Sequence, residues 1–321
     1  MKRALISGIT GMDGSHLAEF LLGNGYEVHG IMRRGSSFTT GRVDHIFERL
    51  TLHHGDLAEA SALRRILEAV QPDEIYHLGG MSHVRVSFDQ AEYTADVVAT
   101  GTLRLLEAVR DMRAPKLRFY QASSSEVFGS APPPQNEETP MCPRSPYGVA
   151  KLAAHHYARM YREAYGLWIA CGILFNHESD RRLETFVTRK VARAVARIRA
   201  GKAGGVSLGN LDAYRDWGWA PEYVIAMHSM LQAESPDDYV IATGESHSVR
   251  EFVQLAFEIG GLGDYRPYVD QDSRYLRPTE VDHLRGDASK ARRVLGWEPR
   301  IKFNGVVAAM VDADIALERE S

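Results

Sequence analysis

Short apolar runs alternate with longer amphipathic segments along the first half of the chain. Six runs have the length and composition of strands: RALISG, YEVHGIM, LTLHHGD, DEIYHLGG, KLRFYQAS and LWIACGILF. The segments between them that carry helical spacing lie at residues 14–23, 59–70, 91–112 and 146–166. Apolar strands that alternate with helices indicate a parallel sheet covered on both faces. The pattern therefore predicts an α/β fold with a doubly wound parallel sheet.

The second half of the chain has a less regular pattern. Helices are predicted at 184–200, at 219–233 and in the segments SVREFVQLAFEIGG and GVVAAMVDADIALERE, and short strands in VSLGN and DYVIATG. A chain of 321 residues favours two domains. We expect residues 1–178 to form the sheet domain, with a later segment near 214–245 returning to it. Residues 179–321 are expected to form mainly a smaller C-terminal substrate-binding lobe.

Composition and charge narrow the range of partners. Hydrophobic residues make up 44% of the chain and charged residues 25%, which is ordinary for a globular protein. A net charge of −4 gives no general attraction to nucleic acid or to an anionic membrane, and no long uncharged apolar run indicates a membrane span. The two cysteines, Cys142 and Cys171, cannot build a disulfide framework, and the chain start resembles a first strand more than a signal peptide. We predict a cytoplasmic protein that binds neither nucleic acid nor membrane.

A glycine-rich turn follows the first predicted strand. The segment GITGMDG places Gly8, Gly11 and Gly14 in a GxxGxxG spacing that leads into a helix. Glycines permit a tight turn and a close approach of backbone to a pyrophosphate, while the helix N-terminus faces the anion. The alternative is a turn that merely joins two elements. The context of strand, turn and helix favours a dinucleotide site in a Rossmann-like fold, with Met12 and Asp13 among its cofactor-binding residues.

Other candidate cofactor residues follow the next three strands. The second strand ends in IMRRGSS, which has no acidic residue to recognise a ribose 2′-hydroxyl. Arg33 and Arg34 are placed to meet a 2′-phosphate, which favours NADP over NAD. The alternative is that they face solvent or a neighbouring subunit. Asp56 and Leu57, after the third strand, suit the adenine side, and Leu78 leads into small residues after the fourth.

The segment SPYGVAK places a tyrosine and a lysine one turn apart at the start of a helix. Ser145 suits the N-cap and Pro146 the first helical position. Tyr147 and Lys151 then share a face, with Cβ atoms about 5–6 Å apart. We expect the helix N-terminus and the ammonium group to lower the pKa of the phenol and so favour a tyrosinate base. Such spacing also occurs by chance on many helices, so the neighbouring residues decide.

The fifth predicted strand ends in ASSSEVFG, at the same sheet edge. A tyrosinate can take a proton from a substrate hydroxyl while hydride leaves the same carbon for NADP. Lys151 suits the nicotinamide ribose, and a serine such as Ser124 can share the proton. Glu126 is surplus for a simple alcohol oxidation, but a carboxylate can remove the acidified proton beside an oxidised sugar carbon. The set therefore predicts an internal redox dehydration in which water is lost and the hydride returns.

With these motifs the chain resembles the extended short-chain dehydrogenase/reductases and, within them, the GDP-mannose 4,6-dehydratase family. The resemblance rests on GITGMDGSHLAEFLL, GYEVHGIMRR, YQASSSEVFG, PRSPYGVAK, GILFNHES, RRLETFVTRK, LGNLDAYRDWG, DDYVIATGE, HSVREF and RPTEVD, which span nearly the whole chain. It implies NADP-dependent conversion of GDP-D-mannose to GDP-4-keto-6-deoxy-D-mannose. The steps are oxidation at C4, deprotonation at C5 with loss of water from C6, and hydride return to C6.

The resemblance also implies roles for individual residues. It implies catalytic roles for Ser124, Glu126, Tyr147 and Lys151, a cofactor contact at His177, and substrate contacts at Ser82, Asn176, Glu178, Lys190, Asn210, Arg215, Arg277 and Glu280. The cationic members suit a diphosphate, and the alternative is ordinary surface charge. It further implies that RRGSSFTTGRVDHIFERL reaches a neighbouring subunit, so a homodimer or homotetramer is expected.

Departures from the family pattern affect the sugar pocket more than the fold. Met12 replaces a glutamine, LGGMSH replaces LAAQSH, Ser124 replaces a threonine, Phe128 a tyrosine and Asp180 a proline. The alternatives that stay open are a dehydratase for another GDP sugar such as a GDP-heptose, an epimerase or reductase of the same fold, and a non-catalytic NADP-sensing protein. Reductase activity would consume added NADPH stoichiometrically.

Two further clusters suggest other functions only weakly. The pairs His53–His54 and His155–His156 are adjacent in sequence and cannot share a face as metal ligands, so no metal is predicted. Arg189, Arg193 and Arg197 form a basic stripe on one predicted helix. Without interleaved aromatic residues, the stripe favours a solvated face, a subunit contact or phosphate binding over nucleic acid.

Overall fold

A seven-stranded parallel sheet forms the centre of the protein. The computed structural model describes residues 1–35 and 39–320. The strands run in the order β11-β6-β5-β4-β1-β2-β3, so the order reverses between β1 and β4. Their bounds are β1 (Arg3–Ser7), β2 (Glu27–Met32), β3 (Leu50–His54), β4 (Glu74–His77), β5 (Arg118–Ser124), β6 (Trp168–Leu174) and β11 (Asp238–Ile241). Ligands of such sheets bind beyond the carboxyl ends of the strands, at this reversal.

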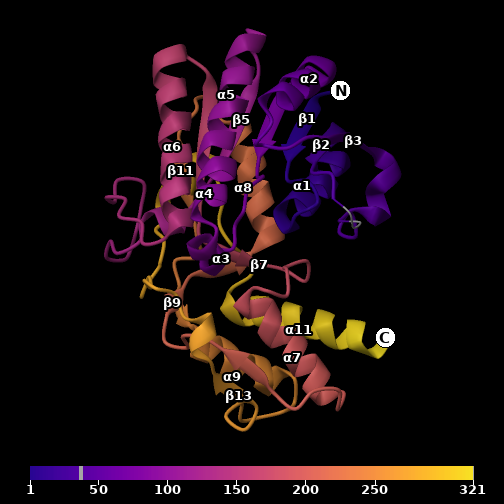
Figure 1. The fold of residues 1–321 in the computed structure, drawn as a ribbon, viewed down its shortest axis with the longest axis vertical. Coiled ribbons are helices and arrows are strands. Elements are labelled where there is room, and N and C mark those ends of the chain that lie inside the picture. Colours follow the sequence, from indigo (N-terminus) through magenta and orange to yellow (C-terminus); the bar gives the residue numbers. More distant parts are fainter. Residues whose placement is uncertain (36–38, 321) are drawn as a thin grey trace.

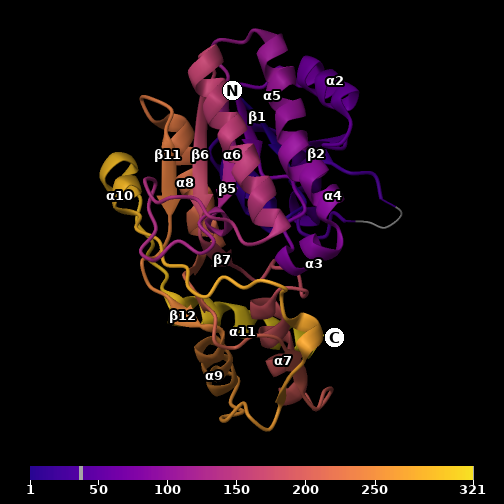
Figure 2. The same cartoon turned by 60° about the vertical axis from the view of Figure 1, so that its left-hand side comes forward.

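Helices cover both faces of the sheet. On one face α1 (Met12–Gly23) packs against α8 (Ala220–Gln232), and on the other α2 (Ala60–Val70) and α6 (Pro146–Tyr165) both contact α5 (Gly101–Met112). Figure 2 shows α5 and α6 side by side in front of the strands. Each layer has its own hydrophobic cluster. The predicted doubly wound parallel sheet is therefore confirmed.

The prediction of one continuous helix at 91–112 is wrong, because three helical segments occupy this range. The chain forms α4 (Ala91–Thr94), the π-helical segment η2 (Ala95–Thr100) and then α5, and an unpredicted helix α3 (Val84–Asp89) precedes them. A π-turn changes which side chains face the core, as happens often at functional sites. Here Gly101 lies so close to Leu57 that a Cβ on it would be 2.9 Å from the Leu57 Cβ. Apolar periodicity alone does not reveal that contact.

A second, smaller lobe lies beyond the carboxyl ends of the strands (Figure 1). The helices α7 (Val187–Arg199), α9 (Val249–Ile259) and α11 (Phe303–Glu320) pack on one another around a separate hydrophobic cluster. Three two-stranded pairs were not predicted as pairs: β7 (Asn176–Glu178) with β10 (Trp217–Trp219), β8 (Val206–Leu208) with β13 (Val269–Gln271), and β9 (Tyr214–Arg215) with β12 (His247–Ser248). That this lobe binds substrate stays a prediction.

Two segments of the second half of the chain pack against the sheet domain. The first comprises α8, which lies on α1, and β11, which pairs with β6. The second is α10 (Ser289–Leu295), which contacts α8 and β11 and was not predicted. After α10, the Trp297 side chain is buried in the same cluster as α8, and its indole N–H donates to the Glu222 carbonyl oxygen at 2.9 Å. Short 3-10 turns occur at η1 (Asp44–Arg49), η3 (Ser125–Val127) and η4 (Ser273–Tyr275).

Among the residues that the structure describes, no helix combines the length and the apolar character that a membrane crossing needs.

Candidate active site

The glycine turn between β1 and α1 is tightly packed. Gly8 has φ +76°, in the left-handed region, and a Cβ on it would lie 3.0 Å from the Gly79 Cα. A Cβ on Gly14 would lie 2.2 Å from the Gly8 carbonyl oxygen. The Gly11 N–H donates to that same oxygen at 2.9 Å, which closes the turn directly before α1 begins at Met12. The turn thus needs its glycines, and it lies where the strand order reverses, as a dinucleotide site requires.

The proposed adenine side lies along the ends of β2 and β3. Arg33 and Arg34 are exposed just beyond β2, and the Arg33 guanidinium donates to the Tyr93 hydroxyl. After β3, the Asp56 carboxylate accepts from the Ala58 N–H at 2.9 Å and Leu57 is buried. Residues 36–38, within the connection expected to reach a neighbouring subunit, lie outside the described residues. The subunit contact therefore stays a prediction.

Asp13 and His177 form a half-buried pair that the sequence did not predict. The His177 Nε2 lies 2.9 Å from the Asp13 Oδ2, and the imidazole stacks on the Tyr223 ring with centroids 4.5 Å apart. Burial opposes both charges, but each partner outweighs it: the pKa of the Asp13 carboxyl is lowered and that of His177 is raised. Two predicted cofactor residues, 164 positions apart, are thus joined under the glycine turn.

The tyrosine and lysine of the predicted base lie on α6 beside the end of β5. The Ser145 hydroxyl caps the helix by accepting from the Gly148 N–H at 3.0 Å, as expected. Tyr147 is buried and hydrogen-bonds Ser124. The Lys151 ammonium donates to the Ala122 carbonyl oxygen at 2.8 Å and lies 5.9 Å from the Tyr147 ring centroid. The end of β5 and the start of α6 therefore deliver hydroxyl, phenol and ammonium to one edge.

The predicted lowering of the Tyr147 pKa is wrong for the protein alone. Burial raises the pKa of Tyr147 to about 12, although the hydrogen bond with Ser124 acts in the opposite direction. Burial also lowers the pKa of Lys151 to about 8. The physical reason is that removal of water disfavours both charged forms, while the ammonium group points at a carbonyl oxygen instead of the phenol. At neutral pH the pair is a phenol beside an ammonium ion.

Glu126 lies one turn beyond β5 among alternating charges. Its Oε1 is 3.4 Å from an Arg277 guanidinium nitrogen, and its Oε2 is buried without a hydrogen-bond partner among the described residues. The same Arg277 nitrogen lies 3.3 Å from Glu280, which in turn pairs with Arg215 at 3.1 Å. The charge of Glu126 acts on Tyr147 and raises its pKa. The Glu126 carboxylate therefore acts on the Tyr147 phenol within one site, and Arg277 and Arg215 carry positive charge on the carboxylate side.

The other predicted substrate residues lie around this centre or in the second lobe. Glu178 is buried and accepts from the Thr188 hydroxyl at 2.9 Å. The Lys190 ammonium donates to the Ser207 carbonyl oxygen at 2.7 Å and lies 3.6 Å from the Tyr275 ring centroid. The remaining substrate candidates are half-buried or exposed: Ser82, Asn176 and Asn210. The cofactor candidate Leu78 is half-buried and packs against the hydrophobic cluster of the sheet domain.

Sequence reasoning did not select Arg182. Its guanidinium pairs with the Glu178 carboxylate at 3.1 Å and lies over the Phe186 ring at 3.7 Å. Its positive charge contributes to lowering the pKa of both Asp13 and Tyr147. Its place in RRLETFVTRK could have indicated it, since this segment begins two residues after Ser179 and leads into the second lobe.

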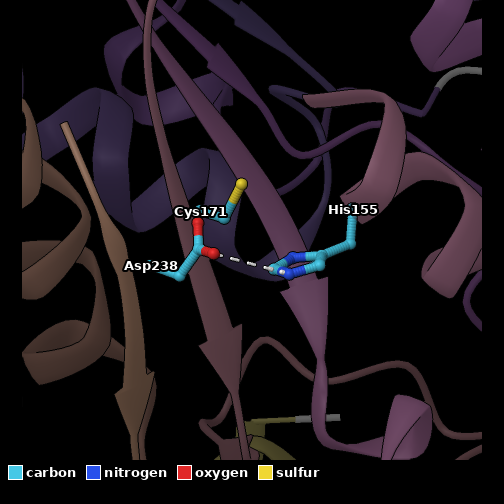
Figure 3. A group of neighbouring side chains, drawn as sticks. All are labelled: His155, Cys171 and Asp238. Atoms are coloured by element: carbon cyan, nitrogen blue, oxygen red, sulfur yellow. Dashed lines mark ion pairs between the residues drawn. The ribbon is translucent and has the colours of Figure 1, made fainter. Parts of the chain in front are cut away.

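A separate cluster behind the site has metal-ligand residue types. Ligand atoms of His155, Cys171 and Asp238 all lie within 4.8 Å of one another (Figure 3). However, Arg162 donates to the Asp238 carboxylate at 2.9 Å. Burial raises the pKa of the Cys171 thiol and lowers that of His155 to about 4. A protonated thiol and an arginine already paired with the carboxylate oppose a cation here, so we assign no metal to this cluster.

Comparison with known proteins identifies the family. A family model described as GDP-mannose 4,6 dehydratase matches residues 5–310. The chain is 56% identical over 329 residues to GDP-mannose 4,6 dehydratase 1 of Arabidopsis thaliana, with 99% of this chain and 91% of that protein covered. It is 52% identical over 342 residues to the GDP-mannose 4,6 dehydratase of Homo sapiens, with coverage of 98% and 92%.

A solved structure agrees with this assignment at the level of the fold. The UDP-glucose 4-epimerase of Thermus thermophilus, solved in complex with NAD, superposes with a TM-score of 0.85 at 25% identity, covering 97% of this chain and 98% of the other. Family model and full-length relatives agree over nearly every residue. The chain therefore belongs to the GDP-mannose 4,6-dehydratase family.

Proposed function

We propose that this chain is an NADP-dependent hydro-lyase that converts GDP-D-mannose to GDP-4-keto-6-deoxy-D-mannose. The observation that carries the proposal is the single site in which Glu126, Tyr147 and Ser124 lie together, beside Lys151. A simple dehydrogenase needs no carboxylate there, whereas a dehydratase needs one. The names of the full-length relatives support the substrate.

The oxidation half of the reaction uses Tyr147, with Ser124 and Lys151. The residues that would hold the dinucleotide are the glycine turn and the residues after β2, β3 and β4, and a bound nicotinamide supplies the hydride acceptor. Tyr147, hydrogen-bonded to Ser124, takes the proton from the C4 hydroxyl. Because its pKa is about 12 in the protein alone, we propose that a cationic nicotinamide beside it is needed to bring that pKa toward neutrality.

The elimination half uses Glu126. Once C4 is a ketone, the C5 proton is acidic. The Oε2 of Glu126, which has no hydrogen-bond partner in the described part of the chain, can take it. The same carboxyl then gives that proton to the departing C6 hydroxyl, which leaves as water. The hydride taken from C4 returns to C6. The proton that Tyr147 took from the C4 hydroxyl then replaces the proton lost from C5. No external oxidant or reductant is consumed.

Charges around the site support the choice of ligands. Arg215, Arg277 and Lys190 suit the diphosphate of the substrate. A structural neighbour named in complex with NAD supports a nicotinamide cofactor. We propose NADP because Arg33 and Arg34 follow β2 where an NAD site usually has a carboxylate. We further propose a cytoplasmic homodimer or homotetramer, as the family resemblance implies.

Product analysis tests the proposal directly. Purified protein with NADP and GDP-mannose should form a 4-keto-6-deoxy sugar with no net accumulation of NADPH. A GDP-heptose offered in parallel separates the nearest alternative substrate. Product from GDP-heptose alone would reassign the sugar, and no product from either sugar, with intact fold and bound NADP, would overturn the dehydratase proposal. Stoichiometric consumption of NADPH by a 4-keto sugar would indicate a reductase instead.

A further inference from the structure

A buried polar chain lies at the point where the strand order reverses. Ser7 and His77 are the last register partners of β1 and β4, so their side chains lie side by side on one face of the sheet. Thr102 of α5 packs onto that face. The three residues are each 2% exposed or less, so none of their polar atoms can rely on solvent.

The direction of every hydrogen bond between Thr102, His77 and Ser7 follows from the bond that Thr102 makes to the backbone. The Thr102 hydroxyl lies 2.7 Å from the Val98 carbonyl oxygen, which can only accept, so the hydroxyl donates there. Its oxygen is 3.1 Å from the His77 Nε2 and must accept from it. The proton is then on Nε2, and the neutral imidazole has a bare Nδ1.

The remaining bonds are equally determined. The Ser7 hydroxyl lies 2.7 Å from the bare Nδ1 of His77 and must donate to it. The Ser7 oxygen then accepts from the Gly79 N–H at 3.1 Å. Burial and the charge of Lys151 hold the pKa of His77 at about 3, so the imidazole stays neutral through the physiological range. The Nε2–H tautomer of His77 is therefore the one that allows the hydrogen bonds joining Thr102, His77, Ser7 and Gly79.

The buried polar chain ends at the Gly79 amide, where two turns are in contact. Gly8 begins the glycine turn after β1, and Gly79 follows the candidate cofactor residue Leu78 after β4. A Cβ on Gly8 would be 3.0 Å from the Gly79 backbone, and a Cβ on Gly79 would be 3.2 Å from the Ser7 Oγ. The two turns that flank the strand-order reversal thus touch, and the polar chain holds one of them against the helix layer.

We infer that His77 is a positioning residue for the dinucleotide. As its Nε2–H tautomer it connects Thr102 of α5, through Ser7, to the Gly79 amide, and so sets the spacing of the two turns between which the cofactor binds. The inference rests on the proposed nicotinamide site. A merely structural histidine would contribute to stability without affecting cofactor affinity more than other core residues do.

The tautomer is tested on the unmodified protein. Nitrogen-15 NMR of histidine-labelled protein, with His77 assigned from a His77→Gln spectrum, should show a proton on Nε2 and none on Nδ1. The reverse tautomer, or an imidazolium at neutral pH, would overturn the inference.

The positioning role is tested with a matched pair of variants. Thr102→Val keeps the shape but removes the acceptor for Nε2–H, whereas Thr102→Ser keeps the hydroxyl. Calorimetric titration with NADP should give a dissociation constant about tenfold higher for T102V than for wild type, and within about twofold for T102S. At saturating NADP the kcat of T102V should approach that of T102S, because the machinery around Glu126 is untouched.

The outcomes separate this inference from the proposed function. Equal NADP affinity in T102V and T102S would overturn the positioning role. Ser7→Ala, which removes the middle donor, gives the same comparison should T102V fail to fold. A wild-type protein that binds neither NADP nor NAD would overturn the proposed function itself, a result distinct from any difference between the two variants.

Discussion

Two ionic clusters of nearly identical composition occupy different regions of the protein. In the second lobe, Arg189 and Arg193 of α7 face Asp314 and Glu318 of α11, with Arg189 2.8 Å and Arg193 3.7 Å from Asp314. At the sheet edge, Arg277 and Arg215 alternate with Glu126 and Glu280.

The difference between the clusters lies in what surrounds them. Asp314 is fully buried between two packed helices, beside the buried Arg189 and the half-buried Arg193. Glu126 instead lies beside Ser124 and Tyr147, in the candidate active site. The same residue types therefore join two helices in one region and form candidate chemistry in the other. Variants that break each cluster should affect different measurements.

The largest effect on stability is expected from Asp314→Ala. Removal of this carboxylate leaves Arg189 buried without its partner, which should lower the free energy of unfolding by about 3 kcal/mol. Chemical denaturation measures the loss. The kcat below the unfolding transition should stay within about twofold of wild type. A stable D314A protein with lost activity would contradict the structural role given to this cluster.

Arg277→Met should instead lower the activity and leave the stability nearly unchanged. The variant loses a proposed diphosphate contact and the ion pair with Glu126, so kcat/KM for GDP-mannose should fall about 50-fold. Thermal unfolding should change little, since Arg277 is partly exposed. Arg277→Lys is the matched control and should recover part of the loss. Wild-type kinetics in R277M would remove this residue from substrate binding.

A smaller effect is expected from Glu280→Gln. The glutamine keeps an acceptor for Arg215 and for the Val281 N–H but loses the charge that orients both arginines. We expect the KM for GDP-mannose to rise about fivefold with kcat nearly unchanged. Steady-state kinetics decide the point, and a change confined to kcat would place Glu280 in the chemistry instead.

The smallest effect is a pH dependence of cofactor binding. Burial lowers the pKa of Lys151 to about 8, so its ammonium group loses its proton as the pH rises through about 8. The affinity for NADP should therefore decline over that range by about threefold. Lys151→Met should bind more weakly and show a flat profile there. An equally flat pH profile of NADP affinity in the wild-type protein would show that the Lys151 charge does not contribute to cofactor binding.

The sheet was predictable because most of its strands carry short apolar runs, and each of the runs predicted as strands forms one. Strand pairs of two or three residues, such as β9 with β12, were not predictable. They depend on tertiary contacts, and no local sequence pattern indicates them. A solvated face was one prediction for the basic stripe on α7, and it is wrong for Arg189, which is buried. Arg189 and Arg193 face acidic residues of α11 more than 100 positions later, and local sequence does not indicate such a partner.

Part of the candidate site followed from the sequence. Ser124, Glu126, Tyr147 and Lys151 lie at one sheet edge because β5 and α6 end and begin there. The direction of the Tyr147 pKa did not follow, since it depends on how much water the folded protein excludes. Polar partners from distant elements, such as Arg182 and the Ser7–His77–Thr102 chain, were also beyond reach of local patterns.

We propose that Glu126 acts at C5 after Tyr147 has acted at C4. NADPH absorbance tests this order when Glu126→Gln, loaded with NADP, is mixed with GDP-mannose. We expect NADPH to form and persist while no 4-keto-6-deoxy sugar appears, because oxidation proceeds and elimination stops. Product formation at the wild-type rate, without persistent NADPH, would contradict it.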